Sequence, residues 1–275
     1  MTARAALSAI QMVDWRRVVA RVSQGVIAVD SAWLLFVLPG GDSRAIVGAD
    51  YRSVLIIARE WLSSGTPYSA AQLAGPFEPT GAIMMYPPVA LLLFVPFLLL
   101  PAALWWAVPA ALMAAALRKL DPSWWAWPLI ALGWLFPASQ TVVMEGNPAM
   151  WAAGAVAGGC LAGWPAVLAL TKPTLAPFAI FGIWRRSWWV ALALFLVACA
   201  PFGNLWISYA TVARHLDTGP VYLVAQWPLM ATPLVAWAGR RPTQSGLDAS
   251  RRGVLADLGR RLGRRIRRDR AATMG

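Results

Sequence analysis

Two aspartates stand where the chain leaves its first apolar segment, in the stretch VLPGGDSRAIVGADYRSVLIIAREWLSSGTPY that begins at Val37. The 275 residues include only 12 Asp and Glu, so Asp42 and Asp50 concentrate a scarce chemical group. A carboxylate in this place is suited to act as a general base toward a hydroxyl group. A plainer interpretation makes Asp50 the N-cap of the helix that follows, worth about 1 kcal/mol.

Lys172 is the second residue whose position suggests chemistry. It lies midway through an apolar stretch, in LALTKPTLAPF, and Pro173 follows it. A lysine inside a membrane span is costly and marks a candidate functional site. Pro173 removes a helical hydrogen bond and breaks the segment, and a cation at such a break is suited to bind an anion. The alternative is that Lys172 extends its ammonium to the membrane interface.

Metal chemistry is not expected. The chain has one histidine and two cysteines, Cys160 and Cys199, and both cysteines lie inside apolar runs. These residues cannot assemble a zinc site of the usual His and Cys type. We therefore expect neither a metal nor a cofactor.

The composition is typical of a polytopic membrane protein built from helices. It is 59% hydrophobic and 13% charged, whereas soluble domains carry roughly 25% charged residues. Seventeen tryptophans are present, many in pairs, and tryptophan gathers at membrane interfaces. We expect an all-α fold with about eight membrane segments.

The apolar runs place the expected segments along the chain. A first span is expected at about 24–38, after a basic flank that favours a cytoplasmic N-terminus. An external loop is then expected at 40–85. The later apolar runs are 87–100, 102–118, 124–139, 147–162, 164–184, 188–203 and 220–238. Several are shorter than the roughly 20 residues of a full span. The sequence therefore predicts the membrane side of the two termini better than the number of spans between them. Residues 1–239 form one expected transmembrane domain.

The remaining residues, 240–275, are a basic tail. They hold 11 of the 24 Lys and Arg. After a series of spans such a tail indicates the cytoplasmic side and not a nucleic-acid-binding segment. Two interpretations stand: a helix that docks on anionic membrane lipids, or a solvated tail that only fixes the topology.

The external loop carries a predicted amphipathic helix along the outer membrane surface. One helical face is apolar, and it comprises Tyr51, Val54, Leu55, Ala58, Trp61 and Leu62. The opposite face is polar, and it comprises Arg52, Arg59, Glu60 and Ser63. This period predicts a helix, with Asp50 as its N-cap and Gly65 as its stop.

The order of these motifs resembles a known family. After the external Asp come Gly65-x-Pro67-Tyr68, then Tyr86-Pro-Pro, then Gly146-Asn147, and finally Lys172-Pro with a following Arg pair. This order resembles the GT-C type glycosyltransferases that use polyprenol-phosphate sugars. It is similar in particular to the glycosyltransferase family 87 mannosyl- and arabinofuranosyltransferases. The resemblance covers roughly 42–186. The chain is shorter than the family norm, and Glu145-Gly146 stands where the family has Gly-Gln.

The resemblance implies a membrane glycosyltransferase of the bacterial plasma membrane, GT-C-like in fold, with both termini cytoplasmic. Such an enzyme moves mannose or arabinofuranose from a polyprenyl-phosphate donor to a hydroxyl of a lipid or glycan acceptor on the external face. The implied base is Asp50, with Asp42 as second choice. The implied donor-phosphate residues are Lys172, Arg52 and His215, and the implied sugar- or acceptor-binding residues are Glu145, Asn147 and Tyr86.

Several of these roles have plainer alternatives. His215 fits an ordinary loop histidine equally well, and Glu145 fits the wall of a polar cavity. The whole chain also fits a transporter, another lipid-handling protein, or a degenerate transferase that serves as a partner subunit. The enzyme hypothesis requires that Asp50 and Lys172 converge on one outward-facing cavity.

Overall fold

The computed structural model describes residues 14–40, 47–78, 81–216 and 224–241. Within them every regular element is a helix, and the only strand-like pairing is an isolated bridge between Phe77 and Leu216. The all-α prediction is thus confirmed for this part of the chain. Residues 1–239 form one compact unit and 240–275 a second one. Asp42 and the tail beyond Arg241 lie outside the described residues.

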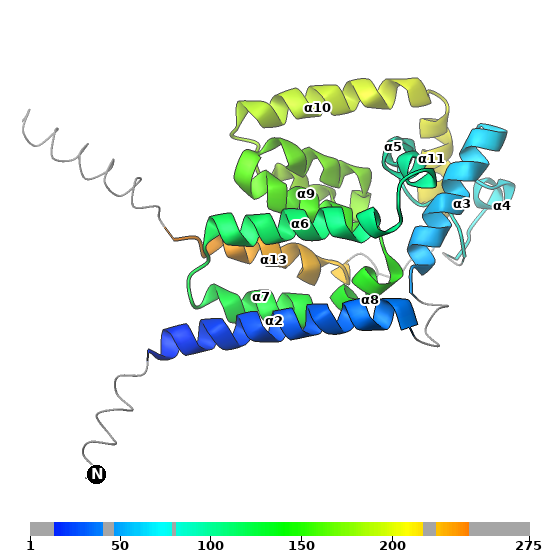
Figure 1. Ribbon diagram of the computed structural model, residues 1–275. Coiled ribbons are helices and arrows are strands. Elements are labelled where there is room, and N and C mark those ends of the chain that lie inside the picture. Colours follow the sequence, from blue (N-terminus) through cyan, green and yellow to red (C-terminus); the bar gives the residue numbers. More distant parts are fainter. Residues whose placement is uncertain (1–13, 41–46, 79–80, 217–223, 242–275) are drawn as a thin grey trace, which may run out of the picture. The chain divides into compact units, whose positions relative to one another are not determined.

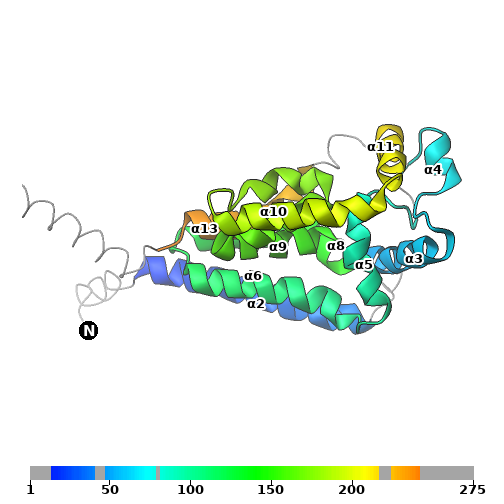
Figure 2. The ribbon, with the colours of Figure 1, turned by 90° about the horizontal axis from the view of Figure 1, so that it is seen from above.

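The helices include both α-helices and 3₁₀-helices, the latter labelled η. In chain order they are α2 (Trp15–Gly40), α3 (Ala49–Ser64), α4 (Ala70–Ala74), η2 (Pro88–Ala90), α5 (Leu91–Phe94), η3 (Val95–Leu98), α6 (Ala103–Leu120), α7 (Ala126–Leu135), α8 (Pro137–Glu145), α9 (Ala149–Ala162), η4 (Trp164–Thr171), η5 (Pro173–Ile180), α10 (Arg186–Cys199), η6 (Ala200–Phe202), α11 (Leu205–His215) and α13 (Trp227–Ala238). Figures 1 and 2 show α3, α4, α5 and α11 gathered at one end of α2, α6 and α10.

The centre of the unit is α9, which packs against α6, η4 and α13 (Figure 1). Nearly all of its residues are buried, and most are alanine or glycine. These small residues let backbones approach closely. A Cβ added at Gly154 would lie 3.0 Å from the backbone of Pro109, and one at Gly159 would lie 2.5 Å from the Cβ of Ala166. The position of α9 therefore depends on the absence of side chains.

The apolar run at 164–184 is interrupted at Lys172, as Pro173 predicts. It forms two 3₁₀-helices, η4 and η5, that pack against each other. Between them Lys172 has an extended backbone, with φ −129° and ψ 100°. The proline ring fixes its own φ and disfavours a helical residue before it. The break is thus a local consequence of the sequence.

Among the described residues, one to three candidate membrane spans are found, whereas the sequence predicts about eight. Of the described helices, α6 alone is long and apolar enough to cross a membrane, and up to three spans exist if each of two bent pairs counts as one. The pairs are α7 with α8, bent by 58°, and Arg186–Phe202 with α11, bent by 95°. Large exposed apolar side chains on α10 also suit a lipid environment, among them Trp189, Val190, Leu194, Leu196 and Val197. The eight-span arrangement stays a prediction.

Asp30, which interrupts the first apolar run, joins α2 to the bend between α7 and α8. Its Oδ2 accepts hydrogen bonds from Trp134 Nε1 and Gln140 Nε2, both at 3.0 Å. The Gln140 amide also donates to the Trp134 carbonyl at 2.8 Å. One carboxylate thereby holds residues from both sides of the bend.

We predict that Asp30→Leu destabilises the fold by about 2 kcal/mol, because it leaves two partly buried donors without an acceptor. Asp30→Asn keeps one acceptor oxygen and should cost less. The measurement is chemical unfolding in detergent, followed by tryptophan fluorescence. Asp14→Asn is the control, since Asp14 pairs with Arg17 at the surface and such pairs contribute at most about 1 kcal/mol. Equal stability of Asp30→Leu and the wild type would contradict this role.

Candidate functional site

The site begins where α3 starts, and here the N-cap prediction for Asp50 is wrong. Gly48 is the N-cap, in the left-handed conformation with φ 68°. Its N–H donates to the Met144 carbonyl at 2.8 Å, which joins the start of α3 to the last turn of α8. Asp50 lies in the first turn instead, where a negative charge complements the helix dipole. The stop at Gly65 is confirmed, with φ 77° and an N–H bonded to the Trp61 carbonyl.

Asp50 faces the loop that follows α8. The Asn147 amide Nδ2 donates a hydrogen bond to Asp50 Oδ2. These residues are 97 positions apart, so packing and not chain proximity brings them together.

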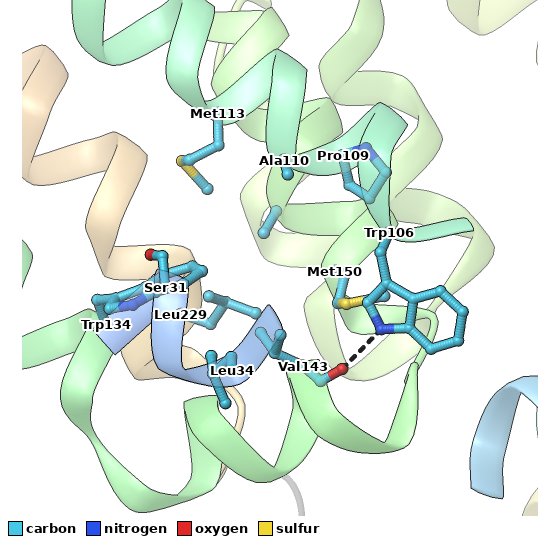
Figure 3. A pocket seen from close by; sticks show the side chains of 11 residues that line it. Ser31, Leu34, Trp106, Pro109, Ala110, Met113, Trp134, Val143, Met150 and Leu229 are labelled. Atoms are coloured by element: carbon cyan, nitrogen blue, oxygen red, sulfur yellow. Dashed lines mark hydrogen bonds between the residues drawn. The ribbon is translucent and has the colours of Figure 1, made fainter. Parts of the chain in front are cut away.

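Two neighbouring tryptophans of α6 fix this loop. Trp105 Nε1 donates to the Gly146 carbonyl at 2.7 Å. Trp106 Nε1 donates to the Val143 carbonyl at 2.8 Å, a bond drawn in Figure 3. Gly146 has φ 70°, and a Cβ there would lie 2.7 Å from the Trp106 ring and 3.0 Å from the Tyr51 Cβ. Position 146 thus requires glycine for both its conformation and its space.

Lys172 meets the other end of the same amide. Its Nζ donates to Asn147 Oδ1 at 2.6 Å, and the Ala149 N–H donates to that oxygen at 2.9 Å. Two donors on Oδ1 fix the amide orientation, so Nδ2 must point toward Asp50. The Lys172 side chain is only 3% exposed, and its Nζ lies 5.4 Å from the centre of the Tyr86 ring.

This arrangement separates a buried cation from a carboxylate by one amide. Among the described residues, no carboxylate lies within 4 Å of the Lys172 ammonium. A buried charge without a partner is costly. Here the Asn147 oxygen and the face of Tyr86 supply the compensation. Asn147 therefore links the charge of Lys172 to that of Asp50.

A cavity of about 420 Å³ opens beside Asp50. Four of the residues predicted from the sequence line it, namely Asp50, Tyr86, Glu145 and Asn147. Ser53, Thr141 and Gln226 add polar groups that the sequence analysis did not single out. Lys172 lies behind Asn147 and Tyr86 and is not part of the wall. The cavity wall therefore carries two carboxylates, with the cation behind it. The expected convergence of Asp50 and Lys172 on one cavity is met by Asp50 alone, and Lys172 reaches the wall only through Asn147.

Two predicted residues, Arg52 and His215, lie elsewhere, and a third is not described. Arg52 is exposed, does not line the cavity, and donates to the Val47 carbonyl at 2.6 Å. His215 ends α11, and its Nδ1 lies 3.0 Å from the Gln72 carbonyl oxygen. Since a carbonyl only accepts, Nδ1 carries the hydrogen in this contact. Asp42 is outside the described residues.

The segment that brings Tyr86 to the cavity is anchored by two buried side chains. The Tyr68 hydroxyl donates to the Tyr86 carbonyl at 2.9 Å, and Gln72 Nε2 donates to the Met84 carbonyl at 3.0 Å. Burial raises the pKa of Tyr68 above its ordinary value, so the phenol remains a donor. The Gly-x-Pro-Tyr motif already contained Tyr68. Nothing in the sequence indicated that Gln72 anchors the same segment.

A second pocket is apolar and smaller, at about 180 Å³. Figure 3 shows side chains of α2, α6 and α9 around it, including Leu34, Met113 and Met150. Its wall carries no charged side chain. This pocket therefore offers no side chain for acid–base chemistry.

Comparisons of the chain with known protein families, with curated proteins and with solved structures find no match. The chemistry of the polar cavity must therefore be argued from its geometry. The resemblance of the motifs to those of GT-C type glycosyltransferases supplies a hypothesis about the reaction.

We predict that Gly146→Ala destabilises the protein by about 3 kcal/mol, because backbone strain adds to contact with the Trp106 ring. Gly65→Ala is the matched control, because Gly65 has a similar φ of 77° but nothing within 4 Å of an added Cβ. It should cost only about 1 kcal/mol. Unfolding of both variants by denaturant measures the difference, and equal losses would contradict the contact with Trp106.

Proposed function

We propose that this protein is a membrane glycosyltransferase that moves a sugar from a polyprenyl-phosphate donor to an acceptor hydroxyl. The observation that carries the proposal is the junction of Asp50 and Lys172 through Asn147 beside one polar cavity. A base and a cation are the two groups that such a transfer needs. The order of the motifs supports the same class of reaction, with mannose or arabinofuranose as the sugar.

Asp50 is the general base in this proposal. Its Oδ2 is occupied by Asn147, whereas Oδ1 has no hydrogen-bond partner among the described residues. An acceptor hydroxyl in the cavity can therefore donate to Oδ1 and give up its proton as it attacks the sugar carbon. The bond from that carbon to the phosphate oxygen breaks, and the polyprenyl phosphate leaves with the electron pair.

Lys172 supplies positive charge for the departing phosphate. Negative charge grows on the leaving oxygen in the transition state, and a fixed cation in a water-poor site stabilises it. The Asn147 amide also keeps Lys172 from pairing directly with Asp50. The cation is thus held ready without neutralising the base.

The proposal places the cavity at the external face of a bacterial plasma membrane. The proposal also includes eight membrane segments, cytoplasmic termini and a basic tail that docks on anionic lipids. A transporter or a partner subunit remains the alternative function. Broken helices fit a transporter, but a carboxylate with one fixed and one free oxygen favours the enzyme.

We predict that Asp50→Asn abolishes transfer while the protein still folds, because an asparagine oxygen can still accept from Asn147. A lost general base should lower the rate by at least about 100-fold. The assay incubates membranes with labelled polyprenyl-phosphate mannose or polyprenyl-phosphate arabinose. Glu60→Gln is the control, since Glu60 is exposed on α3 and does not line the cavity. Full activity of Asp50→Asn would move the base to Asp42 or Glu145.

We predict that Lys172→Met slows turnover more than it weakens donor binding, because a cation behind the cavity wall acts most strongly on the negative charge that grows as the phosphate departs. Lys172→Arg should keep part of the rate, since a guanidinium partly replaces the charge. The measurements are donor affinity and single-turnover rate. Lys119→Met is the control, because Lys119 is the other lysine of the chain and is exposed at the end of α6. Unchanged values for Lys172→Met would remove Lys172 from the reaction.

A further inference from the structure

Arginines from distant parts of the chain gather at one end of the compact unit. They belong to the first two turns of α2, the last turn of α6 and the start of α10, and these helix ends lie opposite α3, α4 and α11 (Figures 1 and 2). All of them are exposed, and together they define the surface that we call the basic end: Arg16, Arg17, Arg21, Arg118, Arg185 and Arg186.

Contacts between the helix ends join this surface. The Arg16 guanidinium lies 5.8 Å from the centre of the Trp124 ring, which links the start of α2 to the connection between α6 and α7. That connection meets the end of α13, because the Ser123 N–H donates to the Gly239 carbonyl at 2.7 Å. The basic end is therefore produced by packing and not by one basic stretch of the sequence.

The start of α10 is fixed to the end of α9. Arg185 Nη1 donates to the Leu161 carbonyl, and the Ser187 hydroxyl donates to the Ala162 carbonyl at 2.8 Å. These bonds satisfy carbonyls that the last turn of α9 leaves without helical partners. Arg185 thus has a structural role, whereas Arg186 beside it is exposed and takes no part in these bonds.

Most charges of the basic end have no ion pair. Arg17 pairs with Asp14, with 3.1 Å between Nε and Oδ2. Four other arginines have no carboxylate within 4 Å in the described part of the chain, namely Arg16, Arg21, Arg118 and Arg186. An exposed cluster of one sign attracts partners of the opposite sign. The basic end therefore complements an anionic surface.

Tryptophans lie among these arginines and indicate the kind of anion. Five of them are 40% to 66% exposed, and those near the basic end are Trp15, Trp124, Trp125, Trp184 and Trp189. Trp184 also stacks on Trp237 at the end of α13, with 6.3 Å between ring centres. Tryptophan and arginine together are typical of the boundary between lipid and water on the cytoplasmic side.

The length of α6 agrees with this boundary. Its 18 residues make it the described helix that can cross a membrane alone, and Arg118 lies in its last turn. A helix of this length spans about 27 Å, close to the roughly 30 Å of a hydrocarbon core. Arg118 therefore lies at the depth of the lipid headgroups when α6 crosses the membrane.

We propose that the basic end binds the headgroups of anionic phospholipids in the cytoplasmic leaflet. The arginines compensate the phosphodiester charge, and the indoles lie between headgroups and acyl chains. Binding here requires neither sugar transfer nor the basic tail, because every residue of the basic end precedes α11. Asp50 of the polar cavity lies on α3, at the opposite end of the unit, so bound lipid leaves it accessible.

The test measures lipid binding by the delipidated full-length protein in a neutral detergent. The probes are phosphatidylglycerol, phosphatidylcholine and glycerol 3-phosphate, which carries the anion without acyl chains. Native mass spectrometry counts the retained lipid at each concentration. We expect phosphatidylglycerol to bind in preference to phosphatidylcholine, and high salt to reduce the preference. Glycerol 3-phosphate at equal concentration should not displace phosphatidylglycerol.

Paired substitutions locate the binding surface. Arg118→Gln with Arg186→Gln removes two charges without ion pairs and should weaken phosphatidylglycerol binding by roughly fivefold for each charge, about 25-fold for the pair. Arg59→Gln with Arg214→Gln is the matched control, because both side chains are exposed on α3 and α11. All these side chains are at the surface, so the Tm without lipid should stay close to that of the wild type.

A second control separates the basic end from the tail. Arg264→Gln with Arg265→Gln removes two charges from the tail and should leave the preference at the basic end in place. Equal binding of the two phospholipids by the wild type, or an unchanged preference in the Arg118 and Arg186 pair, would overturn the inference. Loss of the preference in the tail pair alone would overturn it in favour of the tail, and displacement by glycerol 3-phosphate would replace the membrane with a free anion. Transfer activity enters none of these measurements, so failure of the proposed transferase leaves the result intact.

Discussion

One asparagine amide is the constraint on which the candidate site depends. Asn147 accepts from a buried lysine and donates to an aspartate at the start of another helix. The amide has the same orientation in both contacts, so each partner fixes the other's geometry. Trp105 and Trp106 hold the backbone at Gly146 and Val143, just before the asparagine, and this sets where the amide lies.

The energetic problem of the site is the charge of Lys172. Burying an ammonium is costly, and a direct ion pair with Asp50 would offset that cost while neutralising the base. The fold compensates the cation with an amide oxygen and an aromatic face instead. Lys172 stands at the break between η4 and η5, where its backbone is extended and not helical.

The two pockets described above differ in the polarity of their walls. The polar cavity collects most of its acceptors from α3 and α8, while the apolar pocket lies among α2, α6 and α9. Gln226 precedes α13 at the wall of the polar cavity, and its Oε1 is buried without a hydrogen-bond partner among the described residues.

Local chemistry in the sequence determined the helical class, the break at Pro173 and the stop of α3 at Gly65. It did so because helical period, proline geometry and glycine conformation act within a few residues. The tertiary structure alone decided that Gly48 caps α3, that Asp50 turns to a partner 97 residues away, and that Lys172 lies behind the wall. It also decided that Gln226 joins the cavity and His215 does not. These outcomes depend on how helices pack, and packing joins residues whose distance along the chain carries no signal.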